Sequence, residues 1–243
     1  MKSINLLTKF KQIDTFLHSI EKKTFYENSI SDIDAFATSW FLIFLNPKPN
    51  QLFIKNLGKW WNCQGPTAIF SPAFGIVEYK VNGGQLDWVG YGSETKSKKL
   101  PTNTVVFSCK AFNKINSFNE IINIFEGGHK LKTLQRTKSI SKTAQTTMAF
   151  LQNHFLENFS IEEISRKLNI SYSTMTQEFK KYYGLSPKKY LKKVKVMHAL
   201  HDIKVNSLSV SDSCLNSGFN DFSRFSYYFK QTLGRLPSKY ENQ

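Results

Sequence analysis

The sequence predicts an α+β protein built from two domains, a mostly β domain over residues 1–136 and an all-α domain over residues 137–243. Three observations lead to this prediction. Residues 39–110 contain short runs rich in β-branched and aromatic residues, which favour strands. Beyond residue 143, apolar residues recur at three- and four-residue spacing, which favours helices. Residues 130–243 also carry 19 Lys and Arg against 8 Asp and Glu, so most of the net charge of +15 belongs to the second domain.

The first apolar segment of the chain is expected to be helical. Its apolar residues lie three or four positions apart, which is the period of one face of an α-helix. They are Leu6, Leu7, Phe10, Ile13, Phe16, Leu17 and Ile20. We therefore expect an amphipathic helix ahead of the first strand.

Proline and glycine divide the β-rich run into short strands. Its apolar segments are residues 40–45, 68–70, 76–81, 86–91 and 104–109. Asn82-Gly83-Gly84 separates two of these segments and is typical of a β-hairpin turn. Several aromatic residues of this region are expected in the domain core, with an apolar ligand pocket as the alternative. They are Trp40, Trp60, Trp61, Trp88 and Tyr91.

A polar segment separates the two domains. Ser117 and Glu120 fit a capping box that would begin a short helix, and Gly127 and Gly128 would end it. Residues 130–143, which follow, are polar and basic. We place the domain boundary within this segment, near residue 137.

The second domain contains a degenerate repeat at an offset of 50 residues. Residues 179–190 align with residues 229–240, and six of the twelve positions are identical. Gly184 and Gly234 are equivalent and suit the left-handed position that ends a helix. In each copy a proline three residues later suits the start of the next turn or helix. The repeat predicts that the same helix end is built twice.

Upstream of each copy, the pattern predicts two short helices joined by a tight turn, over about residues 160–182 and 210–233. In the first unit Ser160 and Glu163 fit a capping box, and in the second unit Asp221 suits a helix cap. Such a helix pair in a basic context is typical of a helix-turn-helix. The alternative is two helical hairpins in an ordinary bundle, but the duplication and the charge favour DNA binding.

Residues 187–204 predict a linker helix between the two units. Its 18 residues span roughly 27 Å at about 1.5 Å each, and successive major-groove faces lie roughly 34 Å apart. One chain could therefore place two recognition helices in adjacent major-groove segments of double-stranded DNA. The linker also carries a basic run, expected to be solvated, with some members contacting phosphate or a polymerase subunit. The run is Lys188, Lys189, Lys192, Lys193 and Lys195.

Two residue patterns carry a family resemblance. The first unit contains Ser171-x-Ser173-x-Met175-x-x-x-Phe179-Lys180-x-x-x-Gly184-x-Ser186-Pro187-x-x-Tyr190. The second contains Gly218-Phe219-x-Asp221-x-Ser223-x-Phe225-Ser226-x-x-Phe229-Lys230-x-x-x-Gly234-x-x-Pro237-x-x-Tyr240. Over about residues 144–241 the chain resembles the DNA-binding domain of the AraC/XylS family of bacterial transcription regulators.

The resemblance implies a sequence-specific DNA-binding transcription regulator, and it favours an activator. Many members of the family carry an N-terminal β-barrel of cupin type, so residues 1–136 are expected to form a sensing or assembly domain. The implied partners are DNA, RNA polymerase, a small-molecule effector and a second copy of the chain. We expect no enzymatic activity, no cofactor and no metal site, because none of the five histidines lies in residues 39–110, where a metal-binding cupin would need them.

The outward faces of the two recognition helices supply the candidate DNA-binding residues. In the first helix they are Ser171, Tyr172, Ser173, Thr176, Gln177, Lys180 and Lys181. In the second helix they are Phe222, Ser223, Arg224, Ser226, Tyr227 and Lys230. Gln177 suits bidentate pairing with adenine, whereas Lys180 and Lys181 suit phosphate. Many family members carry Arg where this chain has Gln177 and Tyr227, which argues against assuming a known operator.

Other features argue against membrane and secreted classes. The longest apolar run, residues 40–45, is too short to cross a bilayer, and the N-terminal apolar run is too short for a signal peptide. The cysteines Cys63, Cys109 and Cys214 are few and far apart, which argues against a disulfide framework. We expect a cytoplasmic protein without a membrane partner.

Two rival functions stay open at this point. One is an architectural protein that coats DNA without sequence preference, since a basic surface alone is enough for that. The other is an enzyme that its helical domain delivers to DNA. The sequence has no P-loop, dinucleotide fingerprint, nucleophile elbow or zincin motif, which counts against the enzyme.

Overall fold

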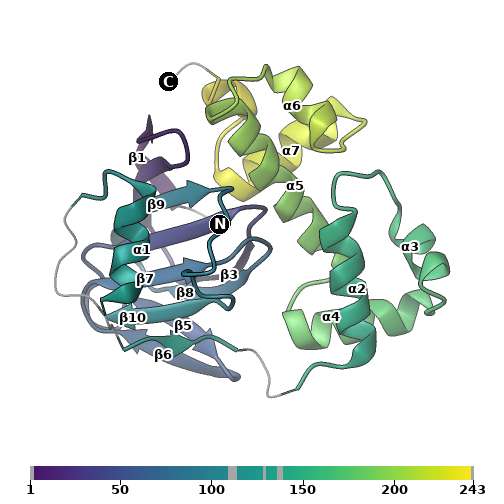
Figure 1. Cartoon of the computed structure of the whole chain (residues 1–243), viewed down its shortest axis with the longest axis horizontal. Coiled ribbons are helices and arrows are strands. Elements are labelled where there is room, and N and C mark those ends of the chain that lie inside the picture. Colours follow the sequence, from purple (N-terminus) through teal and green to yellow (C-terminus); the bar gives the residue numbers. More distant parts are fainter. Residues whose placement is uncertain (1–2, 109–113, 128–129, 136–138, 242–243) are drawn as a thin grey trace. The chain divides into compact units, whose positions relative to one another are not determined.

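The computed structural model describes residues 3–108, 114–127, 130–135 and 139–241. The chain divides into two compact units, Met1–Gln135 and Arg136–Gln243 (Figure 1). Strands dominate the first unit, and the second is helical. The prediction of an α+β protein with a β-rich N-terminal part and a helical C-terminal part is confirmed.

The first unit consists of two antiparallel sheets. The larger has seven strands in the order β1-β2-β9-β4-β7-β10-β11, and the smaller has four in the order β3-β8-β5-β6. The strands are β1 (Ser3–Gln12), β2 (His18–Tyr26), β3 (Ile30–Ala35), β4 (Ser39–Phe44), β5 (Leu52–Asn56), β6 (Lys59–Cys63), β7 (Thr67–Ser71), β8 (Ile76–Val81), β9 (Gly84–Ser93), β10 (Val105–Ser108) and β11 (Lys132–Thr133). Within the described residues both sheets have open edges, so the cupin-type barrel stays a prediction.

Helix α1 (Phe118–Glu126) packs against one face of the seven-stranded sheet (Figure 1). Phe41, Phe70 and Phe107 come from the adjacent strands β4, β7 and β10, and their side chains lie on the same face. The ring of Phe125 from α1 meets them edge-on, with centroid distances of 5.8, 5.2 and 6.0 Å. Full burial of a Phe side chain contributes on the order of 1.5–3 kcal/mol, so these rings stabilise the packing of α1 on the sheet.

The expected N-terminal helix is wrong, because residues 6–20 belong to β1, a turn and the start of β2. The two strands pair antiparallel, from Ser3 opposite Tyr26 to Gln12 opposite His18. A register shift between Asn5 and Leu7 interrupts the two-residue alternation. With the alternation interrupted, the apolar residues of these strands fall three or four positions apart, which is also the spacing of a helix.

The expected hairpin at residues 82–84 is also wrong. β8 pairs with β3 and β5, whereas β9 pairs with β2 and β4. The turn thus carries the chain from the smaller sheet to the larger one. Asn82 fixes it, since its backbone N–H donates to the carbonyl of Gln51 at 2.8 Å. Turn residues define the local backbone, but they do not choose the partner strands.

The aromatic and cysteine side chains of the first unit divide by exposure. Trp40 and Tyr91 are buried, as expected, whereas Trp60 is 40% exposed on the edge strand β6. Cys63 is a buried free thiol, and burial raises its pKa to about 12. Cys109 and Gly128 lie outside the described residues.

The second unit contains seven helical segments among its described residues. They are α2 (Lys142–Asn153), α3 (Ile161–Lys167), α4 (Tyr172–Tyr183), α5 (Pro187–Lys204), α6 (Val210–Asn216), α7 (Phe222–Leu233) and a short 3₁₀ turn, η1 (Pro237–Lys239). Each α-helix begins at a side-chain cap that accepts a backbone N–H three residues later. The caps are Ser141, Ser160, Ser171, Ser186, Ser209 and Asp221.

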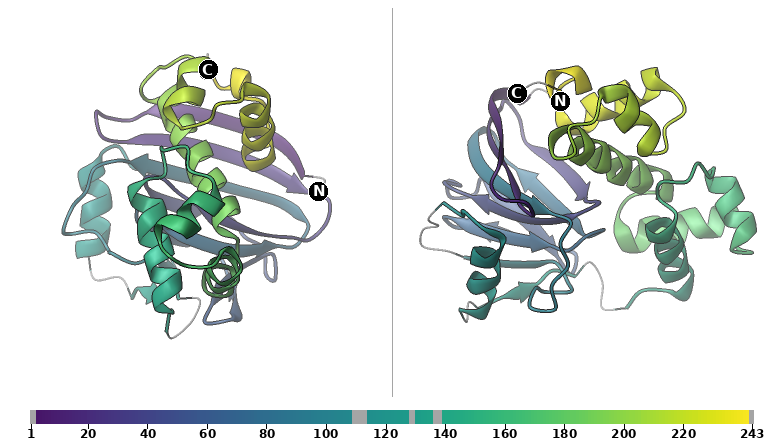
Figure 2. Two further views of the ribbon diagram at one scale, coloured as in Figure 1. Left: turned by 90° about the vertical axis from the view of Figure 1, so that its right-hand side faces the viewer. Right: turned by 45° about the horizontal axis from the view of Figure 1, so that its top comes forward.

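The residues repeated in the sequence pack behind α4 and α7, the second helix of each predicted helix-turn-helix. Phe179 meets Tyr190 edge-on at 5.7 Å, and Phe229 meets Tyr240 in the same way at 5.4 Å. Both helices end in a left-handed glycine, with φ of 82° at Gly184 and 83° at Gly234. The long helix α5 contacts α2 and α4 on one side of the unit and α6 and α7 on the other (Figure 2).

No helix in the described parts of the chain combines the length and the apolar character needed to cross a bilayer.

Candidate nucleic-acid interface

Two helix pairs, α3–α4 and α6–α7, have the short-helix, tight-turn, long-helix order of a helix-turn-helix. One residue in each turn is left-handed, Asn169 with φ of 53° and Gly218 with φ of 70°. The residue after it closes the turn, because the N–H of Ile170 donates to Ser165 and that of Phe219 donates to Cys214, at 3.0 and 3.1 Å. The same backbone device thus presents α4 and α7.

The two recognition helices show the same order of exposure along their length. Residues 171–180 and residues 221–230 match position by position. The buried members are Met175 and Phe179 in the first helix and Phe225 and Phe229 in the second. All thirteen candidate DNA-binding residues lie outside this buried stripe, and eleven are exposed while Thr176 and Ser226 are half-buried. The structure therefore brings the candidates together into two equivalent outward faces.

In α4, local hydrogen bonds distinguish the residue that caps the helix from residues whose side chains lie along its exposed face. The hydroxyl of Ser171 accepts the Thr174 N–H at 3.1 Å and donates to the Thr174 hydroxyl at 2.8 Å, so Ser171 is occupied as a helix cap. The Nε2 of Gln177 donates to the Ser173 hydroxyl at 3.2 Å, which holds the amide along the exposed face. The Oγ1 of Thr176 is inaccessible, so its hydroxyl reaches DNA only after rotation.

The second helix offers rings and one guanidinium. Phe222 and Tyr227 are large exposed aromatic side chains, and the Tyr227 ring meets the Tyr228 ring edge-on at 5.3 Å. Arg224 lies near the cap, with its Nε 3.5 Å from Asp221 Oδ2. Because both partners are exposed, this ion pair is weak and leaves the guanidinium able to turn toward a base or a phosphate.

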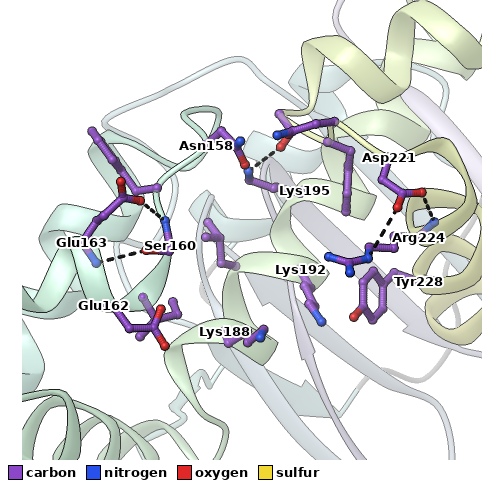
Figure 3. Close-up of a pocket in the computed structure, with 16 residues that line it drawn as sticks. Asn158, Ser160, Glu162, Glu163, Lys188, Lys192, Lys195, Asp221, Arg224 and Tyr228 are labelled. Carbon is purple, nitrogen blue, oxygen red and sulfur yellow. Dashed lines mark hydrogen bonds and ion pairs between the residues drawn. The ribbon is translucent and has the colours of Figure 1, made fainter.

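A cleft of about 630 Å³ separates the two helix-turn-helix units (Figure 3). Its walls are the start of α3, one side of α5 and the α6–α7 turn with the first half of α7. Its charged side chains are Lys188, Lys192, Lys195, Arg224, Glu162, Glu163 and Asp221. Two of the carboxylates act in helix capping, because Glu163 accepts the Ser160 N–H and Asp221 accepts the Arg224 N–H.

Within the cleft, Lys192 and Tyr228 form a pair that the sequence reading missed. The ammonium of Lys192 lies 3.5 Å from the centroid of the Tyr228 ring. A hydrogen bond from Lys192 lowers the pKa of the Tyr228 hydroxyl. The two residues are distant in sequence, and only the packing of α7 on α5 brings them together.

One member of the basic run departs from its expected place. Lys188 and Lys189 are exposed and Lys192 and Lys193 are half-buried, but the side chain of Lys195 is only 6% exposed. The expectation of a solvated side chain is therefore wrong for Lys195. Its ammonium is held by backbone carbonyls of segments distant in sequence, a surrounding that a local pattern of lysines does not reveal.

Among the described residues, no group of three or more His, Cys, Asp or Glu side chains is placed to hold a metal ion. The two histidines of the linker helix α5, His198 and His201, pack against other residues of the helical unit. His201 is buried, and the ring of His198 meets the Phe155 ring edge-on at 5.4 Å.

Comparison with known proteins matches residues 164–243 to the family described as "Helix-turn-helix domain". One curated relative, the HTH-type transcriptional activator RhaS of Klebsiella pneumoniae (strain 342), is 29% identical over 115 residues, which are 44% of this chain and 41% of the relative. This chain thus aligns with about two fifths of that relative's length.

Two solved structures of ToxT from Vibrio cholerae are similar across both units. One, a 1.65 Å structure, has a TM-score of 0.58 at 12% identity, and the match covers 93% of this chain and 98% of ToxT. The other, a fatty acid-bound form from strain SCE256, has a TM-score of 0.57 at 12% identity and covers 95% and 96%. At this identity the likeness concerns the fold, a β-rich N-terminal part followed by a helical part.

Proposed function

Because the C-terminal helical domain of this chain belongs to the AraC/XylS family, we propose that the protein is a sequence-specific DNA-binding transcription regulator. The observation that carries the proposal is the pair of equivalent, outward-facing recognition helices, α4 and α7, joined through the continuous helix α5. Two such helices on one chain suit two adjacent major-groove segments, which repressors with one unit per chain reach only as dimers.

The exposed side chains divide into base readers and phosphate contacts. Gln177 has the amide that pairs bidentately with adenine, and Phe222 has an apolar ring suited to a thymine methyl group. Lys180, Lys181 and Lys230 lie at or near the C-terminal ends of their helices and suit phosphate oxygens. The chain has 29 Lys and only 4 Arg, which favours charge-driven backbone contact over guanine reading.

For the β-rich N-terminal unit, Met1–Gln135, we propose a role in sensing or assembly. The fold likeness to ToxT, which has been solved in an unsaturated fatty acid-bound form, supports a small-molecule effector as the first candidate. A homodimer is the second candidate. An effector would raise the melting temperature of the full chain, since a ligand that binds the folded state stabilises it. A dimer would show as a doubled mass in sedimentation.

We further propose that the regulator acts as an activator and contacts RNA polymerase. The name of the RhaS relative, a transcriptional activator, supports this direction of regulation. Run-off transcription from a promoter with the bound site upstream measures it: the chain should increase transcript yield, and a decrease would make it a repressor.

Binding-site selection from random duplex DNA tests the proposed function. The full chain should enrich two half-sites whose centres lie about 10–10.5 base pairs apart. Failure to enrich any sequence, with unrelated duplex competing equally well, would instead describe an architectural DNA-binding protein. A single half-site would mean that only one unit reads DNA.

A further inference from the structure

The buried lysine of the linker helix holds together segments from both sides of the cleft. The Nζ of Lys195 donates to the carbonyl of Glu157 at 3.1 Å and to the carbonyl of Gly218 at 2.8 Å. Glu157 lies between α2 and α3 of the first helix-turn-helix region, and Gly218 lies in the α6–α7 turn of the second. In Figure 3, Lys195 lies at one end of the cleft, with a dashed line from its ammonium.

A second contact joins the same three segments one helical turn further along α5. The Nδ1 of His198 lies 3.1 Å from the Ser217 hydroxyl, which belongs to the α6–α7 connection. The ring of His198 also packs edge-on against Phe155, two residues before Glu157. Lys195 and His198 are three residues apart and so share a face of α5. The linker helix is therefore tied twice to each of its two neighbours.

The backbone at Gly218 closes this junction. A Cβ at this position would overlap the carbonyl oxygen of Leu156 and would lie 2.8 Å from the Lys195 Nζ. The residue is also left-handed, with φ of 70°. The α6–α7 turn thus rests directly on the segment that follows α2. We call Lys195, His198, Gly218 and the segment 155–157 the inter-unit junction.

An ammonium buried against carbonyls is expensive, because both the charge and its water shell are lost to the interior. Burial lowers the pKa of Lys195 to about 8, which reflects this cost. An apolar side chain would fill the same space at lower cost but would leave the two carbonyls without a donor. Lys195 is therefore suited to fixing the angle between segments rather than to adding stability.

We propose that Lys195 is a positioning residue that sets the register between the two DNA-reading units, and so restricts the chain to one half-site spacing. The inference rests on the proposed two-site DNA binding. One extra base pair rotates the second half-site by about 35° and moves it by about 3.4 Å, given 10–10.5 base pairs per turn of 34–36 Å. A junction that holds both units rigidly cannot follow that rotation, whereas a loosened junction can.

The test compares duplexes in which the selected half-sites are moved apart by zero, one or two base pairs. For the full native chain, affinity should fall steeply with each insertion. Lys195→Met should bind an isolated half-site like the native chain but flatten the spacing profile. It should also lose about tenfold of the gain that the second half-site brings at native spacing, since a looser linkage lowers the effective concentration of the second unit.

Lys189→Met removes one charge from an exposed position on the same helix and serves as the matched control. It should keep the native spacing profile even if all affinities fall together. Ser217→Ala deletes only the hydroxyl beside His198 and should flatten the profile less than Lys195→Met. Circular dichroism and thermal melting establish first that each variant is folded.

The results separate this inference from the proposed function. A native chain that gains no affinity from a second half-site at any spacing would contradict two-site binding itself. A native chain that gains from the second half-site equally at every spacing would overturn the junction proposal and leave two-site binding standing. A native chain strict about spacing, with folded Lys195→Met equally strict, would overturn the junction proposal alone. If Lys195→Met does not fold, Ser217→Ala decides: a native-like profile overturns the proposal, and a flattened one supports it.

Discussion

The two helix-turn-helix units have the same backbone conformation but different exposed side chains. Their recognition helices have the same order of exposure, the same left-handed glycine cap and the same Phe–Tyr contact behind them. At equivalent exposed positions they differ, with Gln177 opposite Tyr227 and Lys181 opposite Gln231. The Phe, Gly and Tyr residues that hold each helix in place are repeated, whereas most residues that would contact DNA differ, with Ser173 and Lys180 recurring as Ser223 and Lys230. The residues that pack each recognition helix can therefore be changed separately from those proposed to contact DNA, and the following substitutions test that separation.

The largest effect is expected from breaking the connection between the units. Val194 is fully buried in the middle of α5. Val194→Pro removes a backbone hydrogen bond and kinks the helix, at about 3 kcal/mol or more. A footprint on the selected site should shrink from about two turns to one weak half-site. Val194→Ala keeps the backbone bond and should keep the two-turn footprint. An unchanged two-turn footprint at unchanged affinity in a folded Val194→Pro chain would show that the units act independently.

A smaller effect is expected from the reading positions themselves. Gln177→Ala should cost about 1–3 kcal/mol on the best sequence and relax base preference at one position. Tyr227→Phe, at the equivalent place in the second unit, should change neither affinity nor preference, because a ring contact does not need the hydroxyl. Selection repeated with each variant measures this. Equal loss on all sequences in Gln177→Ala would contradict base reading by α4.

The charge difference between the units predicts a change in salt dependence. Lys181→Gln gives the first unit the residue that the second has at Gln231, and should reduce the slope of log K against log salt by about one. The reverse exchange, Gln231→Lys, should increase the slope by about one if the two faces are equivalent. Titrations at several salt concentrations give both slopes. No change in either variant would place this position away from phosphate.

The smallest effect concerns the capping box of α3. The Ser160 N–H donates to the Glu163 carboxylate at 2.7 Å, and this bond lowers the pKa of Glu163 from 4.5. Its stabilising contribution is therefore full above the unfolded pKa and is lost as pH falls through the lower folded value. Glu163→Gln keeps a hydrogen-bond acceptor that does not titrate. Its melting temperature should fall less than that of the native chain as pH is lowered, and parallel profiles would show that this carboxylate does not contribute.

The helical unit was predictable because its signals are local. The caps at Ser160, Ser171 and Asp221 and the glycines that end α4 and α7 each determine a few neighbouring residues, and the 18-residue linker helix has the expected bounds. The β-rich N-terminal unit was less predictable because its strands depend on partner strands far along the chain. The strand β1 is defined by its pairing with β2, and the turn at residues 82–84 by two different sheets.

The same reasoning applies within the candidate interface. Exposure of Gln177, Lys180 and Tyr227 follows from the helical period, so these positions could be chosen from the sequence. The burial of Lys195 could not, because its carbonyl partners come from two separate loops. A lysine among lysines carries no sign of such partners.

The turn at Gly218 also sets how the two units could be exchanged between related proteins. The equivalent turn in the first unit is made by Asn169, whose side chain projects into solvent, so that position admits any residue that accepts a left-handed backbone. Gly218 has no such freedom, because the carbonyl of Leu156 occupies the place of a Cβ. A graft of the second reading unit is therefore incomplete if it begins at α6. The piece that can be transplanted is the unit together with segment 155–157 and the linker face that carries Lys195.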